Sequence, residues 1–168
     1  MEKVLLAIDG VNPNGRAFSY AVELCKRIRA ELNVLQVISP RNIAHYLKMV
    51  HEGARCAKEY IEGTMVAAAF SEAGEYEAAR DLRAQALQKI NQLLPQSERV
   101  GVPFRVTIKS GRPSNEIICY VEEHRDVVLT IYDKARKENP SCNGVVPDSV
   151  VLRKVREQLP IPLVVMRD

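Results

Sequence analysis

Charged side chains follow two of the most apolar stretches of the sequence. Asp9 closes the run Lys3 to Ile8 (KVLLAI), and the run Val127 to Ile131 (VVLTI) leads into a polar connection that contains the basic segment 134–137 (KARK). A carboxylate accepts hydrogen bonds or binds cations, whereas lysine and arginine bind anions. If the two runs lie side by side, these groups face one small ligand. Plainer interpretations stay open, because Asp9 could only close a turn and charged loops are usually solvated.

Metal chemistry and catalysis have weaker support in the sequence. His45, His51 and Cys56 miss the i, i+4 spacing that places two ligands on one helix face, so we expect no metal site. The four cysteines include no C-x-x-C pair, and we expect them to be reduced. The chain contains neither GxxxxGK[ST] nor GxSxG, and no Ser-Gly-Gly loop follows the first apolar run. We therefore predict no catalytic residues and expect that the protein is not an enzyme.

Alternating strands and helices must position these residues. Three continuous apolar runs, 3–8, 32–38 and 127–131, are typical of strands that are buried on both faces of a sheet. Residues 103–109 alternate between apolar and polar, which predicts a strand nearer an edge. The last strand, 162–166, opens on a proline, which also favours an edge position.

Between these strands, apolar residues recur at helical spacing. They predict helices over about 14–29, 76–94, 113–124 and 147–158. The order predicts an α/β fold, an open parallel sheet with helices on both faces and right-handed crossovers. Such sheets bind ligands beyond the carboxyl ends of the strands where the winding reverses, which here lies beside Asp9 and the residues that follow Ile131.

Residues 41–75 form an unusual helical insertion after the second strand. Tyr46, Met49, Met65 and Phe70 are larger than a short helix needs for docking on its own sheet. Exposure of so much apolar surface is uncommon in a soluble monomer. The segment either covers the crevice as a lid or contacts a subunit or protein client, and periodicity does not choose between the two.

Length and composition limit the remaining possibilities. The chain has 168 residues, 46% hydrophobic and 27% charged, as expected for one ordinary globular domain over 1–168. Its 24 basic and 21 acidic side chains alternate along the sequence, so no nucleic-acid surface is indicated. No apolar run is long enough for a membrane span, and the first residues do not resemble a secretion signal, so we expect a cytoplasmic location without membrane contact.

Three stretches together resemble the universal stress protein family. They are KVLLAIDG followed by a helix and VLQVI, then VTIKSGRPSNEIICYVEEHRDVVLTI, and finally DSVVLRKVREQLPIPLVVMRD. The resemblance covers the chain except for roughly 41–75. It implies a Rossmann-like, nucleotide-binding-like fold with five parallel strands in the order 3-2-1-4-5.

The nucleotide site of that family is altered in this sequence. Many members bind ATP through Gly-x2-Gly-x9-Gly-Ser/Thr after the fourth strand, where glycines let backbone amides approach the phosphates. Counting back by the family spacing places Ala135, Glu138 and Asp148 at the three glycine positions. A carboxylate aimed at a triphosphate is repulsive. ATP or another adenine nucleotide is therefore disfavoured, and no cofactor is firmly expected.

The resemblance also implies a set of ligand-binding residues. Ala7 and Asp9 would lie near the adenine side, Val37 at the end of the second strand, and Ser149 and Val150 at the phosphate end. Ser149 has an alternative role as a helix cap.

Basic residues of the connection, Lys134 and Arg136, could bind an anion in place of the glycines. The resulting hypothesis is a stress-response regulatory domain that acts by dimerisation and through an altered small-ligand pocket, without catalysis. The alternative is an adenine-nucleotide-binding stress protein with slow hydrolysis. The family commonly dimerises through its last strand, here the apolar edge Leu163, Val164, Val165 and Met166, so we expect a homodimer.

Overall fold

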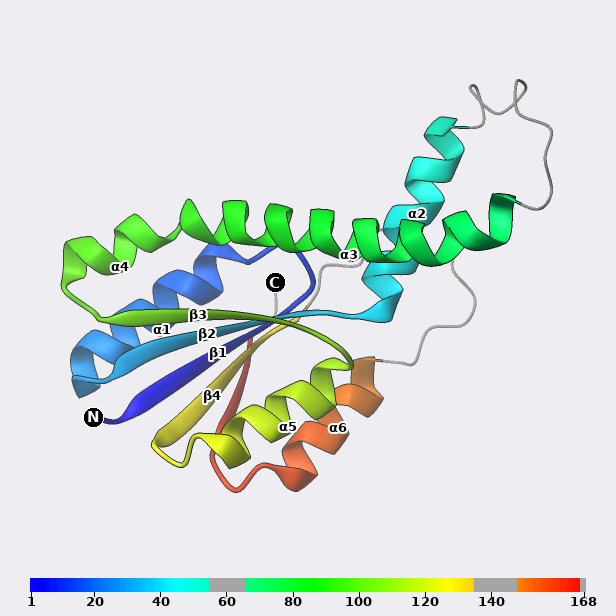
Figure 1. Ribbon diagram of the computed structural model, residues 1–168. Coiled ribbons are helices and arrows are strands. Elements are labelled where there is room, and N and C mark those ends of the chain that lie inside the picture. Colours follow the sequence, from blue (N-terminus) through cyan, green and yellow to red (C-terminus); the bar gives the residue numbers. More distant parts are fainter. Residues whose placement is uncertain (55–65, 135–147, 167–168) are drawn as a thin grey trace.

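Five strands form one parallel sheet. The computed structural model describes residues 1–54, 66–134 and 148–166 (Figure 1). Within them the sheet order is β3-β2-β1-β4-β5, which confirms the predicted α/β fold and strand order. The strands are β1 (Lys3–Asp9), β2 (Glu31–Ile38), β3 (Phe104–Ser110), β4 (Val127–Asp133) and β5 (Leu163–Met166). The alternating strand and the strand opened by proline are indeed the two edges.

Helices cover both faces of this sheet. Figure 1 shows α1, α3 and α4 on one face and α5 and α6 on the other. The described helices are α1 (Gly15–Ile28), α2 (Pro40–Ala54), α3 (Val66–Asn91), α4 (Leu94–Val100), α5 (Pro113–Glu123) and α6 (Asp148–Gln158). None of the helices in these described ranges combines the length and apolar character needed to cross a bilayer.

Burial of β1 on both faces explains why its sequence does not alternate between apolar and polar residues. Val4, Leu6 and Ile8 pack into the core under α1, whereas Leu5 and Ala7 pack into the core under α5 and α6. All five are at most 1% exposed. A strand between two helical layers is apolar on both faces.

The ends of α1 are fixed by two residues outside the helix. Asn14 is the N-cap, and its side-chain oxygen accepts a hydrogen bond from the Arg16 backbone N–H at 2.9 Å. At the other end Arg29 adopts a left-handed conformation with φ 57°, and its N–H is donated to the Cys25 carbonyl. Glycine is the usual residue for this conformation.

Three predicted boundaries are wrong. β4 continues through Tyr132 and Asp133, although the sequence predicts that both belong to the polar connection. The helix predicted at 76–94 begins earlier and ends at Asn91, and α4 follows as a separate helix with Pro95 in its first turn. Proline lacks an N–H and fits the first turn of a new helix better than the interior of a continuing one.

The first part of the insertion packs against α3. Ile43 and Tyr46 of α2 pack with Leu82 and Ala86 of α3, and the Tyr46 hydroxyl donates to the Asp81 carboxylate at 3.2 Å. Figure 1 shows the rest of α2 and the beginning of α3 projecting beyond the sheet. The part of the insertion at 55–65 lies outside the described residues, so the choice between lid and interface stays open.

Candidate functional site

The candidate site lies at the carboxyl ends of β1 and β4. These strands are neighbours in the sheet, and Ile8 pairs with Asp133. Asp9 therefore ends β1 one residue beyond the level at which Asp133 ends β4. From β1 the chain continues to β2 on one side, and β4 lies on the other, so this is the position at which an open parallel sheet holds its ligand.

Asp133 binds the beginning of α1. Its side chain is only 3% exposed, and its Oδ2 accepts a hydrogen bond from the Asn14 backbone N–H at 2.8 Å. Because the first N–H groups of a helix lack partners within the helix, a carboxylate there is favourable both as an acceptor and as a negative charge. The carboxylate thus occupies a position at which a free helix end could otherwise bind an anion.

Asp9 is held from the side by Tyr132. The Tyr132 hydroxyl donates to Asp9 Oδ2 at 3.1 Å, and the tyrosine itself is 1% exposed. Asp9 stays partly exposed. The site therefore has one carboxylate turned into the protein and a second one oriented at the surface.

The loop between β1 and α1 is fastened on two sides. Gly10, at φ 100°, donates its N–H to the Val37 carbonyl at 3.0 Å and accepts a hydrogen bond from Gln36 Nε2 at 2.9 Å. Further along the loop, Asn12 Oδ1 accepts a hydrogen bond from Lys89 of α3. The positive φ explains why glycine follows Asp9.

Four of the seven predicted ligand-binding residues lie at this edge. Asp9 pairs with Val37 across β1 and β2, and Lys134 directly follows Asp133. Ala7 pairs with Tyr132, one step further into the sheet. Ala7 and Val37 are fully buried in the core under α5 and α6, so their side chains pack inside the protein beneath this edge.

The other three predicted residues lie in α6 or outside the described residues. Val150 is 45% exposed in the first turn of α6. Ser149 belongs to the same helix turn, whereas Arg136 lies outside the described residues. A ligand-binding role for any of the seven stays a prediction.

Sequence reasoning missed Tyr132, Asp133, Gln36 and Lys89 as parts of this edge. One signal for Asp133 was present, because it ends an apolar run just as Asp9 does. No comparable signal marks Lys89, which reaches the loop from a distant helix. In the part of the chain that the structure describes, no three histidine, cysteine, aspartate or glutamate side chains gather as a metal site requires.

Comparison with known families agrees with this architecture. The model of the universal stress protein family matches residues 1–131. The chain belongs to that family. The match ends at Ile131, before the connection in which the family's glycine motif would lie. No curated protein matches the chain significantly.

Solved structures resemble this universal stress protein over nearly its whole length. The hypothetical protein MJ0577 is similar with a TM-score of 0.63 and 19% identity, over 99% of this chain and 96% of that one. Universal stress protein UspA from Lactobacillus plantarum gives 0.60 and 17%, over 99% and 97%. A family member from Arabidopsis thaliana, solved with AMP bound, gives 0.53 and 16%, over 99% and 91%. At these identities the similarity concerns the fold.

Proposed function

We propose that this universal stress protein is a non-catalytic regulatory protein that acts through self-association and through a small-ligand pocket beside Asp9. The pocket favours ligands with little negative charge over nucleoside triphosphates. The proposal rests on the family, on the position of the carboxyl edge in the fold, and on the charges found there.

The carboxylate of Asp133 is the observation that carries the proposal. It accepts the Asn14 N–H at 2.8 Å, and Asp9 lies at the end of the neighbouring strand. A phosphate that approached the beginning of α1 would meet two carboxylates. Replacement of the family's glycines by Ala135, Glu138 and Asp148 acts in the same direction.

Adenosine and AMP are the ligands with which to test the pocket, since an Arabidopsis relative was solved with AMP. In calorimetric titrations of the full chain, we expect adenosine or AMP to bind at least as tightly as Mg-ATP. Asp9→Asn should change the affinity for adenosine, whereas Asp81→Asn, on the distant α3 surface, should not. Micromolar affinity for Mg-ATP together with weaker binding of adenosine and AMP would contradict the proposal.

A second candidate function is adenine-nucleotide binding with slow hydrolysis. Lys134 favours it, because this cation follows β4 directly and could offset the charge of a phosphate. Incubation with Mg-ATP should then release phosphate at a rate that falls in Lys134→Ala. No release above that of Lys134→Ala would exclude this candidate.

Self-association is proposed through the outer edge of β5. In the described residues β5 pairs with β4 alone, and Leu163, Val164, Val165 and Met166 are all half-buried. An unpaired apolar edge is a template for a second strand, and two copies that meet antiparallel form a closed dimer.

Light scattering tests this assembly. The wild-type chain should have the mass of a dimer, and Met166→Lys should shift it toward the monomer because a charged edge resists pairing. Val106→Lys places the same change on the opposite edge strand, β3, and should leave the dimer intact. A wild-type mass that equals the monomer at every concentration would remove the proposal.

A further inference from the structure

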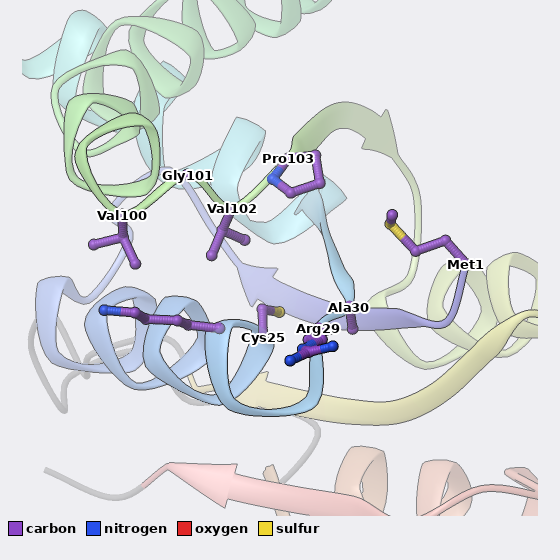
Figure 2. Close-up of a pocket in the computed structure, with 9 residues that line it drawn as sticks. Met1, Cys25, Arg29, Ala30, Val100, Gly101, Val102 and Pro103 are labelled. Atoms are coloured by element: carbon purple, nitrogen blue, oxygen red, sulfur yellow. The ribbon is translucent and has the colours of Figure 1, made fainter.

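A small cavity lies at the amino end of the sheet, opposite the edge that carries Asp9. It has a volume of about 230 Å³ and lies between the end of α1, the turn from α4 into β3 and the start of the chain. Figure 2 shows Cys25 and Arg29 on one side, Val102 and Pro103 facing them, and Met1 at the far end. None of the candidate-site residues at the carboxyl ends of the strands lines this cavity.

The floor of this cavity is apolar. Cys25, Ala30 and Val102 are 0%, 2% and 5% exposed, respectively, and they belong to the core under α1. Burial raises the pKa of the Cys25 thiol to about 12, so the thiol is neutral and unreactive at physiological pH. The floor therefore suits an aromatic or aliphatic group and adds no charge.

The rim of the cavity is cationic. Lys26 and Arg29 are among the lining residues, and none of the lining residues is acidic. No acidic side chain of the described residues forms an ion pair with either cation within 4.0 Å. The end of α1 carries about half a negative charge from its dipole, which the two cations outweigh.

Arg29 occupies a position where its backbone is strained. Its φ of 57° lies in the left-handed region that favours glycine. Complementing the helix dipole does not require arginine there, because Lys26 and Arg27 already place positive charge in the last turn. Arg29 therefore combines a strained backbone conformation with a place in the lining of the cavity.

We propose that this cavity binds a small amphipathic carboxylate, with its apolar group against Cys25, Ala30 and Val102 and its carboxylate at Arg29 and Lys26. The volume sets the size of the apolar group. Drug-sized ligands usually occupy about 300–1,000 Å³, whereas a protein cavity of about 150 Å³ accommodates benzene. One aromatic ring with a short acidic arm therefore fits the available space.

Phenylacetate, phenylacetamide and phenylethylammonium are suitable probes, since they share one ring and differ in charge. Each is titrated into the full chain labelled on alanine and valine methyl groups and followed by NMR. Phenylacetate should shift the methyl signals of Ala30 and Val102 saturably. Phenylacetamide should bind about four- to 25-fold more weakly, as expected for loss of two exposed ion pairs that contribute about two- to fivefold each, and the cation should not bind there.

Three variants locate the charge and the cavity. Arg29→Gly, which the backbone conformation suits, should weaken phenylacetate about two- to fivefold. Arg27→Ala removes one charge from the same helix end, but Arg27 pairs with Glu23 at 2.8 Å and does not line the cavity, so its effect should be smaller. Val100→Phe, at the rim, should reduce binding by filling the space.

Several results would overturn this inference. They are the absence of saturable shifts with phenylacetate, equal affinity for the acid and the amide, or an equal loss in the Arg27 and Arg29 variants. Unchanged binding in Val100→Phe would likewise show that the ligand lies elsewhere.

Discussion

Replacing Asp133 by asparagine tests the link between the candidate site and the stability of α1. The carboxylate is 3% exposed and accepts the Asn14 N–H at 2.8 Å. A hydrogen bond to a charged group contributes about 1.5–3 kcal/mol and a neutral one about 0.5–1.5 kcal/mol. The charge at the helix start adds about 0.3–1 kcal/mol. Because asparagine keeps an acceptor oxygen but avoids the cost of burying a charge, we expect the free energy of unfolding to fall by about 1–2 kcal/mol.

Urea unfolding followed by circular dichroism measures this loss, with the slope against urea unchanged. In a thermal scan a chain of this size should lose about 2–8 °C in Tm. Asp126→Asn is the matched control, because Asp126 pairs with Lys3 at 2.5 Å at the opposite end of the sheet but is 43% exposed, and exposed pairs contribute little. Asp133→Asn should also strengthen Mg-ATP binding, since one of the two carboxylates loses its charge. Stability within about 0.3 kcal/mol of the wild type, or a larger loss in the control, would refute the reasoning.

Three further variants test other parts of the fold. Ile90→Ala should lower the free energy of unfolding by about 2–5 kcal/mol, because Ile90 is 0% exposed on the inner face of α3. Leu87, which is 46% exposed on the same helix, should tolerate alanine. Similar effects of the two variants would mean that α3 does not pack on the core as described. Arg29→Gly should raise the free energy of unfolding by about 0.5–1 kcal/mol, since relief of the left-handed strain exceeds the entropy cost of glycine. A decrease would contradict this. The hydrogen bond with Lys3 holds the pKa of Asp126 below its ordinary value, and the same bond raises that of Lys3. Asp126 therefore contributes a small amount of stability that is complete above its ordinary pKa and is lost as pH falls through the folded value, so Asp126→Asn should slightly flatten the acid limb of stability against pH; an unchanged acid limb would refute this.

The central strands could be predicted closely because local composition decides them. Residues 4–8 are buried on both faces, and the absence of alternation in their sequence reports this directly. The end of β4 could not be placed in the same way. Tyr132 and Asp133 look like the start of a polar loop, and pairing with β1 on one side and β5 on the other keeps them in the strand. Such pairing joins residues far apart in the sequence.

The candidate site could be predicted in its position but not in its bonds. The switch-point rule leads from the strand order to the neighbourhood of Asp9. Whether Asp133 faces a ligand or the beginning of α1 depends on where Asn14 lies, which the sequence leaves open. Lys89 shows the same limit, because its contact with Asn12 depends on how α3 crosses the sheet.

The length of α3 has a consequence for how the molecule rotates in solution. Its 26 residues correspond to about 39 Å of helix, whereas β3, one of the strands that it contacts, has seven residues and spans about 23 Å. A considerable part of α3 therefore extends past the sheet, as Figure 1 shows, and gives the particle a long axis. Rotational diffusion should be faster about this axis than across it. The amide vectors of α3, which all lie along the helix, should then share one NMR relaxation ratio that differs from the ratios of the strands.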